Sequence, residues 1–273
     1  MTDPTLTTGA VALPDWALIH AHGPDAATFL QGQLTQDVLT LAPGAARLAG
    51  YCSPKGRLLA SMVVWRDGGD GFYLACSADV REATLKRLKM FVLRAKCTLE
   101  ADATPLAGVL GAAPAGSLAL GPGRALHFGL PSGAEAAAED WAWAEVASGV
   151  PRIVAACADQ FVPQMVNFEL VGGVSFQKGC YPGQEVVARS QYRGTTKRRL
   201  ALVRSTAPLT PAAEVFAADD PDQPAGMVVL AASRAGAHTA QVALKLAALA
   251  QPLRCGDAVL TVQPLPYAIA EED

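Results

Sequence analysis

A cysteine in a glycine-punctuated loop is the residue best suited to chemistry in this 273-residue sequence. Cys180 lies two positions after Lys178, and Gly179 and Gly183 flank it. A nearby ammonium lowers the pKa of a thiol and raises its thiolate fraction, the form that attacks electrophiles and binds metals. Glycines allow backbone conformations and close approaches that a Cβ atom would prevent. The loop by itself is compatible with a reactive thiol and equally with a structural cysteine in a tight turn.

Other residues that could bind a metal lack the usual spacing. The six cysteines include no Cys-x-x-Cys pair, which argues against a zinc ribbon or a ferredoxin-type cluster. His20 and His22 alternate on a predicted strand, and the next histidine in the sequence is His127. We interpret this pair as ordinary hydrogen-bonded or exposed histidines and predict no bound metal. The sequence also contains no dinucleotide-binding fingerprint, Walker A motif or Gly-x-Ser-x-Gly elbow.

The first hundred residues show the pattern of an α+β unit. The patterns predict a strand over 16–22, a helix over 26–31, a hairpin of strands 58–66 and 71–76 around Asp67–Asp70, and a second helix after an N-cap at Ser77. This order of strand, helix, hairpin and helix is typical of a ferredoxin-like arrangement. The stretch 101–138 is rich in Ala, Gly and Pro, and we interpret it as a loosely specified segment.

The pattern changes again near residue 200. Short apolar runs over 200–204, 225–231, 241–246 and 258–262 alternate with turns rich in Pro, Gly and Asp, which favours a small β-barrel. We therefore predict an α+β protein with a region over 1–197, divided into sub-parts 1–100 and 101–197, and a C-terminal β-barrel domain over 198–273.

Composition limits the classes of protein that fit. Hydrophobic residues make up 51% of the chain and charged residues 17%, with a net charge of −3, as expected of a folded globular protein. No apolar run approaches the ~20 residues that span a bilayer. The first basic residue is Arg47, so we expect no secretory or transit peptide and a cytoplasmic protein without membrane contact.

Basic residues gather in two stretches. Residues 81–96 carry six basic side chains and one acidic one, and residues 178–204 carry seven and one. Such segregation attracts an anionic ligand to one part of a mildly acidic protein. We do not expect direct nucleic-acid binding, because only Tyr181 and Tyr192 are interleaved with the second basic stretch.

The residues around Cys180 resemble the signature of the YgfZ family, folate-binding relatives of the glycine cleavage T-protein. Lys178–Glu185 matches the family motif Lys-Gly-Cys-Tyr-x-Gly-Gln-Glu, with Pro182 at the free position. The flanks 161–170 and 188–194 agree with the family pattern as well. The same agreement is found in the segments 15–18 and 31–38 and in the segment 264–267 near the end of the sequence.

The resemblance implies a GcvT-like ring of two α+β pieces and a barrel around a central pocket for tetrahydrofolate or a derivative. It also implies a role in maintaining iron–sulfur enzymes or assisting their assembly factors, and through them in tRNA modification. By local match the two tryptophans of the folate site fall on Trp16 and Trp141, with Trp143 close to the second. We expect further folate contacts from Tyr181, Gln184, Glu185 and Arg193, and assign Cys180 and Lys178 to a reactive loop.

The alternative function is a folate-dependent aminomethyltransferase of the T-protein type. In the T-protein a pair of Asp residues follows a Gly-x-x-x pattern on an early strand. Here Gly56 leads instead to Ala60 and Ser61. Loss of a general acid–base group typically costs 10²–10⁴-fold in rate. We therefore favour an accessory protein over a classical enzyme.

Overall fold

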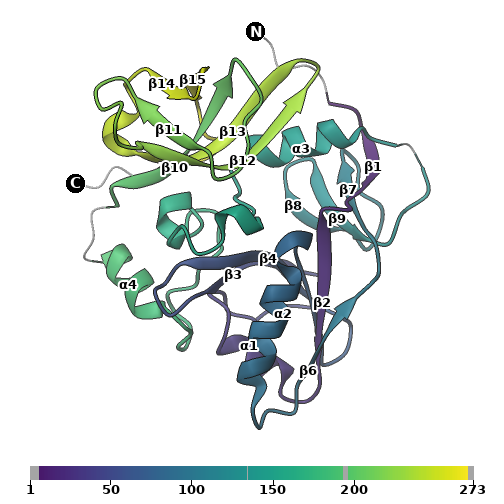
Figure 1. Cartoon of the computed structure of the whole chain (residues 1–273). Coiled ribbons are helices and arrows are strands. Elements are labelled where there is room, and N and C mark those ends of the chain that lie inside the picture. Colours follow the sequence, from purple (N-terminus) through teal and green to yellow (C-terminus); the bar gives the residue numbers. More distant parts are fainter. Residues whose placement is uncertain (1–5, 134, 193–195, 270–273) are drawn as a thin grey trace.

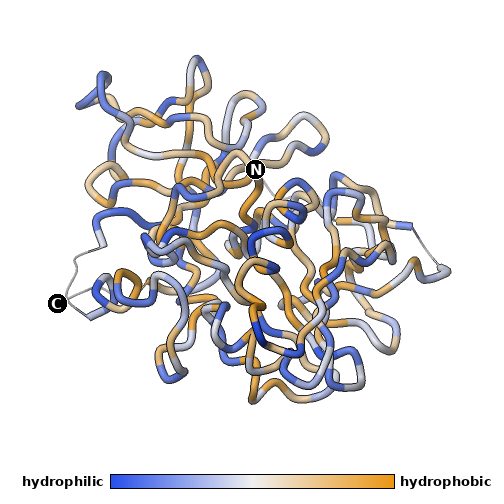
Figure 2. The backbone as a smooth tube through the Cα atoms, turned by 60° about the horizontal axis from the view of Figure 1, so that its bottom comes forward, coloured by the Kyte–Doolittle hydropathy of each residue, from blue (hydrophilic) through white to orange (hydrophobic). Residues whose placement is uncertain are grey.

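Two sheets and a closed barrel make up the protein in the computed structural model, which describes residues 6–133, 135–192 and 196–269. Figure 1 shows the barrel at one end and the five-stranded sheet with its two helices at the other. The sheets and the barrel pack into one body, and the apolar stretches of the chain run largely through its interior (Figure 2). In the described part of the chain, no helix is long and apolar enough to cross a membrane. The two sheets and the closed barrel confirm the predicted α+β fold with a C-terminal β-barrel.

The five-stranded sheet has the ferredoxin-like order that the sequence predicts. Its strand order is β3-β4-β5-β2-β6, and all neighbours are antiparallel. The elements are β2 (Trp16–His22), α1 (Ala26–Gln31), β3 (Ala46–Cys52), β4 (Leu58–Arg66), β5 (Phe72–Ser77), α2 (Ala78–Val92) and β6 (Thr98–Asp102). Both helices pack on one face of this sheet, where Leu85 and Leu88 of α2 are buried.

The start of α2 differs from the sequence interpretation in one detail. Ser77 occupies the N-cap position, but its side chain makes no capping hydrogen bond. Its hydroxyl accepts instead from Arg152, 3.0 Å away. The side chain that is predicted to cap α2 thus binds Arg152, a residue distant in sequence.

The stretch that the sequence leaves loosely specified forms most of a second sheet. This sheet has the order β1-β7-β9-β8 and contains β1 (Gly9–Ala12), β7 (Leu106–Leu110), β8 (Leu118–Gly121) and β9 (Arg124–Phe128). The helix α3 (Ala138–Ala147) packs on it. A Cβ atom at Gly108 would lie 2.4 Å from the Trp141 ring, so the small residues that obscure the strand pattern make room for this helix.

The barrel closes as the patterns after residue 200 suggest. Its order is β10-β13-β12-β11-β14-β15, formed by β10 (Arg198–Ser205), β11 (Glu214–Ala217), β12 (Gly226–Arg234), β13 (Ala237–Lys245), β14 (Leu253–Cys255) and β15 (Ala258–Gln263). The short strands β11 and β14 carry no periodicity long enough to be found from sequence.

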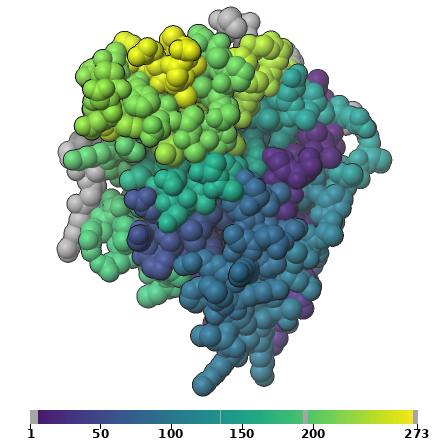
Figure 3. Space-filling model, in the orientation of Figure 1, coloured from purple at the N-terminus to yellow at the C-terminus, as the bar shows by residue number. Residues whose placement is uncertain are grey.

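A middle layer joins the barrel to the five-stranded sheet (Figure 3). It contains the short 3-10 helices η1 (Ala155–Cys157) and η2 (Pro163–Val166) and continues to α4 (Gln184–Tyr192). One hydrophobic cluster combines Leu58 of β4, Phe161 and Phe168 of this layer, and Leu200 and Val229 of the barrel. A third 3-10 turn, η3 (Leu246–Ala248), follows β13.

Candidate functional site

A cavity of about 280 Å³ lies where the two sheets meet the middle layer. One wall comes from β2, β3 and β4, and another from β8 and β9. The segment before η1 and the turn after η2 complete it. Its lining includes Trp16, Arg47, Ser61, Leu120, Arg124, Glu145, Val150, Pro151, Arg152 and Gly172. Because these residues come from distant parts of the chain, only the folded protein forms the site.

A buried arginine organises one side of this cavity. The Arg152 guanidinium donates from Nε to Glu145 Oε1 at 2.8 Å and from Nη2 to Glu145 Oε2 at 3.0 Å. It also donates to Asp15 Oδ2 at 2.6 Å. Its carbon Cζ lies 5.1 Å from the centre of the Trp16 ring, within the range of a cation–π contact. Burial lowers the pKa of Arg152, but the carboxylates of Glu145 and Asp15 outweigh it and raise the pKa.

A second buried arginine, Arg124, has a hydrogen-bond donor without a partner. Arg124 lies over the Trp141 ring at 5.2 Å, and its Nη1 has no hydrogen-bond partner. Burial lowers the pKa of this guanidinium, while Glu145 acts in the opposite direction. The indole Nε1 of Trp16 is buried and unpartnered as well. An unpaired buried donor costs about 1–3 kcal/mol, so an acceptor on a bound ligand that came within reach of either N–H group would recover part of this cost.

Of the expected folate-binding residues, Trp16 alone belongs to the described lining of this cavity. Trp141 lies behind Arg124, so it supports the wall instead of forming it. Trp143 is buried against Arg204 of the barrel, 4.4 Å from ring centre to guanidinium carbon. Tyr181, Gln184 and Glu185 lie in the loop and in α4, away from the lining, and Arg193 falls outside the described residues.

Three arginines that line the cavity, Arg47, Arg124 and Arg152, are not predicted from the sequence. Arg47 lines it while its Nη1 donates to Thr40 Oγ1 at 2.8 Å. Arg124 is a single charge in a stretch of small residues, and Arg152 directly follows Pro151. A lone buried charge beside small apolar residues is the signal that could have drawn attention to Arg124.

The loop around Cys180 is anchored by Lys178. The Lys178 ammonium donates to the backbone oxygens of Gln31 and Leu34, at the end of α1, and lies 5.0 Å from the centre of the Tyr181 ring. Burial lowers the pKa of Lys178 to about 8, against the charges of Asp37 and of the Cys180 thiolate. Cys180 itself is exposed. The structure therefore presents this thiol to solvent beside a partly buried amine.

Glu185, one of the expected folate contacts, is not among the described lining residues of the cavity. Its carboxylate accepts instead from Arg189, one turn later in α4, and both side chains are largely exposed. The reason is that Glu185 already belongs to the first turn of α4, from which its side chain projects into solvent.

The two glycines of the loop, Gly179 and Gly183, differ in whether their positions could accept a larger residue. Gly183 has a φ of +78°, and a Cβ atom there would lie 2.4 Å from the Ser53 carbonyl oxygen. Gly179 has open space around the same position, so the expected steric need for glycine holds for Gly183 and is wrong for Gly179.

This difference gives a matched pair of variants. Gly183→Ala is expected to lower the free energy of unfolding by about 1–3 kcal/mol, since it combines a backbone clash with a strained φ. Gly179→Ala should change it by less than about 0.5 kcal/mol. Urea unfolding of both variants measures this, and equal stability of the two would contradict the assigned packing of the loop on the turn at Ser53.

Ala60 and Ser61, which the resemblance places where the T-protein has its carboxylates, are consecutive residues of β4. Ala60 is fully buried, and the Ser61 hydroxyl lines the cavity, where it accepts from the backbone N–H of Ile153 at 2.9 Å. Among the described lining residues Glu145 is the one carboxylate, and both of its oxygens are held by Arg152.

Comparison with known proteins fits this architecture. No model of a protein family matches the chain. The tRNA-modifying protein YgfZ of Serratia proteamaculans is 31% identical over 96% of this chain and 93% of its own length. The protein of the same name from Pectobacterium carotovorum is 32% identical over 96% and 92%. The crystal structure of aminomethyltransferase T of the glycine cleavage system from Bartonella henselae superposes with a TM-score of 0.69 at 15% identity, covering 95% of this chain and 86% of that one.

The solved structure shows a shared fold, whereas the two relatives named YgfZ also show the family of this chain. Their similarity runs over nearly the whole of both chains. The chain belongs to the YgfZ family.

Proposed function

We propose that this protein binds a reduced folate, tetrahydrofolate or a derivative of it, in the central cavity. In this proposal it serves as an accessory protein for iron–sulfur enzymes and, through them, for tRNA modification. The observation that carries the folate proposal is the pair of unpartnered N–H donors, Arg124 Nη1 and Trp16 Nε1, on two residues that line one cavity. The relatives' name, tRNA-modifying protein, supports the wider role.

The cavity suits the chemistry of a folate. A pterin is a flat heteroaromatic ring with carbonyl and ring-nitrogen acceptors, and the Trp16 indole offers both a face for stacking and a donor. The glutamate tail is anionic, and three arginines against one carboxylate make the described lining positive. Bound tetrahydrofolate would supply a carrier of one-carbon units, while Arg124 and Trp16 would bind and orient it.

The fold itself is equally compatible with an aminomethyltransferase, but the cavity favours an accessory role. Transfer of an aminomethyl group needs a carboxylate that handles the amine, and Ala60 and Ser61 cannot do so. Glu145 is engaged by Arg152 through both oxygens. A glycine cleavage assay with this chain in place of the T-protein should stay at background, and turnover within about tenfold of the true enzyme would favour the transferase.

Folate binding is tested by titrating tetrahydrofolate while recording tryptophan fluorescence. Wild-type protein should show quenching that saturates and weakens as salt rises. Arg124→Met should weaken binding by about 10- to 100-fold, because a hydrogen bond to a charged group contributes about 1.5–3 kcal/mol. Arg94→Met, which removes an exposed charge far from the cavity lining, is the matched control. No binding at millimolar ligand would end the folate proposal.

A further inference from the structure

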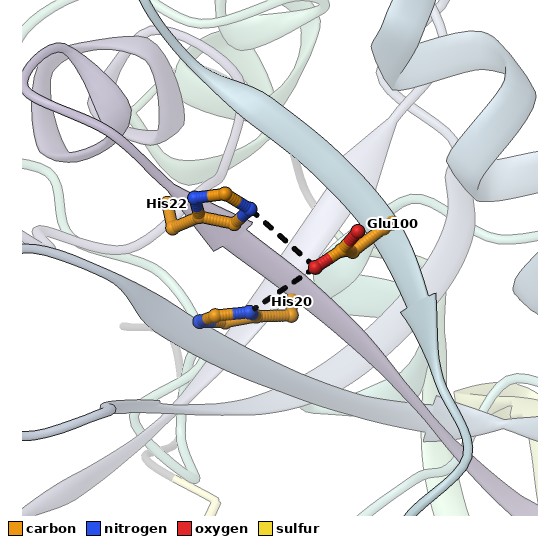
Figure 4. A group of neighbouring side chains, drawn as sticks. All are labelled: His20, His22 and Glu100. Atoms are coloured by element: carbon orange, nitrogen blue, oxygen red, sulfur yellow. Dashed lines mark ion pairs between the residues drawn. The ribbon is translucent and has the colours of Figure 1, made fainter.

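A second cluster of polar side chains lies on the five-stranded sheet, outside the cavity. Ile19 and Ala21 of β2 pack against α1 and α2. Since side chains alternate along a strand, His20 and His22 project together from the opposite face. Strand β6 pairs with β2 so that Glu100 stands directly beside His20. Figure 4 shows the two imidazole rings stacked one above the other, with the Glu100 carboxylate directed at both.

The distances from Glu100 to the two histidines are longer than hydrogen bonds and close to the spacing of two metal ligands. Glu100 Oε1 lies 3.4 Å from His22 Nε2 and 3.8 Å from His20 Nδ1. Both separations exceed the usual hydrogen-bond range of about 2.7–3.2 Å. With metal–ligand bonds of about 2.0–2.2 Å, two ligands of a tetrahedral Zn²⁺ stand about 3.3 Å apart. The three ligand atoms all lie within 4.8 Å of one another, so the two imidazole nitrogens must move closer together for all three to bind one ion.

Asp67 fixes which nitrogen of His20 is free to bind. Asp67 Oδ2 lies 2.9 Å from His20 Nε2, and Asp67 Oδ1 is held by the backbone N–H groups of Gly69 and Gly71 at 2.8 and 3.1 Å. An ionised carboxylate only accepts hydrogen bonds, so Nε2 carries the proton and Nδ1 presents its lone pair to Glu100. A lone pair facing a carboxylate oxygen favours a cation between them, either a proton or a metal ion.

Ring packing holds this arrangement in place. His20 stacks on Tyr73 at 4.5 Å between ring centres and on His22 at 4.8 Å. A carboxylate that orients the far nitrogen of a ligating histidine is the usual second layer of a metal site. Here Asp67 occupies that position, and the stacked rings limit rotation of the first ligand.

We propose that His20 Nδ1, His22 Nε2 and Glu100 form a binding site for a divalent transition-metal ion, with Asp67 as its positioning residue. Two imidazoles and a carboxylate favour ions such as Zn²⁺, Ni²⁺, Co²⁺ or Fe²⁺ over Mg²⁺ and Ca²⁺. The side chains of His22 and Glu100 are 40% and 57% exposed, so the ion is open to solvent. Three protein ligands leave a position for water or an exchanging ligand.

The test titrates Zn²⁺ into untagged, metal-stripped full-length protein in competition with a chromophoric chelator. One ion per chain is expected. His22→Gln and Glu100→Gln should each weaken binding by at least about tenfold, and Asp67→Asn by about 10- to 100-fold. His238→Gln is the matched control, because His238 is a half-buried histidine that bonds to Ser233 on the barrel. Because the side chains of His22 and Glu100 are exposed, we expect both variants to fold like the wild type, and circular dichroism verifies this.

The exposed thiol of Cys180 provides the competing explanation for any bound metal. Absorption of the Co²⁺-loaded protein separates the two, because thiolate ligation adds an intense near-ultraviolet charge-transfer band that nitrogen and oxygen ligands lack. Absence of stoichiometric binding would overturn the proposal. So would binding that survives in His22→Gln and Glu100→Gln but disappears in Cys180→Ser.

Discussion

Arg152→Met is expected to lower the free energy of unfolding by about 3–5 kcal/mol, the usual effect of removing one partner from a buried ion pair. The side chains of Arg152 and Glu145 are 9% and 5% exposed. Without the guanidinium, the Glu145 carboxylate would remain buried and unpaired, and Asp15 and the Ser77 hydroxyl would each lose a donor. Urea unfolding followed by circular dichroism measures the loss.

An exposed arginine–glutamate pair in the same chain is the matched control. Arg189 pairs with Glu185, and their side chains are 66% and 83% exposed. Arg189→Met should therefore change stability by at most about 1 kcal/mol. Adding Glu145→Gln to Arg152→Met should recover part of the loss, because the stranded charge is removed. Equal effects of the two methionine variants, or no recovery in the double variant, would contradict the assigned role of the pair.

Local patterns were sufficient to predict several elements of the fold. The β4–β5 hairpin is predicted by the turn Asp67–Asp70, where the Asp67 carboxylate accepts from two backbone N–H groups. The second sheet could not be predicted in the same way. Its strands are short and rich in Ala and Gly, and they are stabilised by packing on Trp141 of α3, a contact that only the folded chain creates.

The site was harder to predict than the fold for the same reason. Trp16, which the resemblance assigns to the folate site, lines the cavity, but Arg124, Glu145 and Arg152 carry no common motif in the sequence. Glu100 illustrates the limit again. It comes beside His20 through pairing of β2 with β6, nearly eighty residues apart in sequence, so the two histidines alone gave no indication of a third ligand.

Cys180 is expected to react with iodoacetamide far faster than the other five cysteines, with a difference of orders of magnitude. Cys52, Cys76, Cys97 and Cys157 are buried, and Cys255 is partly exposed. Burial raises the pKa of Cys52 and that of Cys76 to about 12. At pH 8 a thiol with such a pKa is thiolate about once in ten thousand molecules, and it is shielded from the reagent as well. Peptide mass spectrometry over a time course measures each rate.

Three variants sharpen this labelling experiment. Cys180→Ser should remove the fast phase, whereas Cys255→Ser, which removes the next most accessible thiol, should leave it intact. Lys178→Met should slow labelling below pH 8, where the ammonium with its pKa of about 8 is charged. If Cys180 labels no faster than Cys255, or if Lys178→Met has no effect on its rate, the exposed loop does not activate the thiol.

A reactive thiol is not necessarily a functional one, so the role of Cys180 must also be tested in cells. A bacterial strain that lacks its own family member should recover normal levels of modified tRNA nucleosides when it carries this chain, and Cys180→Ala should fail to restore them. Because Cys180 is exposed and packs little, its truncation should leave the free energy of unfolding within about 0.5 kcal/mol of wild type. A stable Cys180→Ala protein without complementation would tie the role of the loop to the sulfur atom. Full complementation by Cys180→Ala would instead assign the loop a purely structural role and leave the cavity as the centre of function.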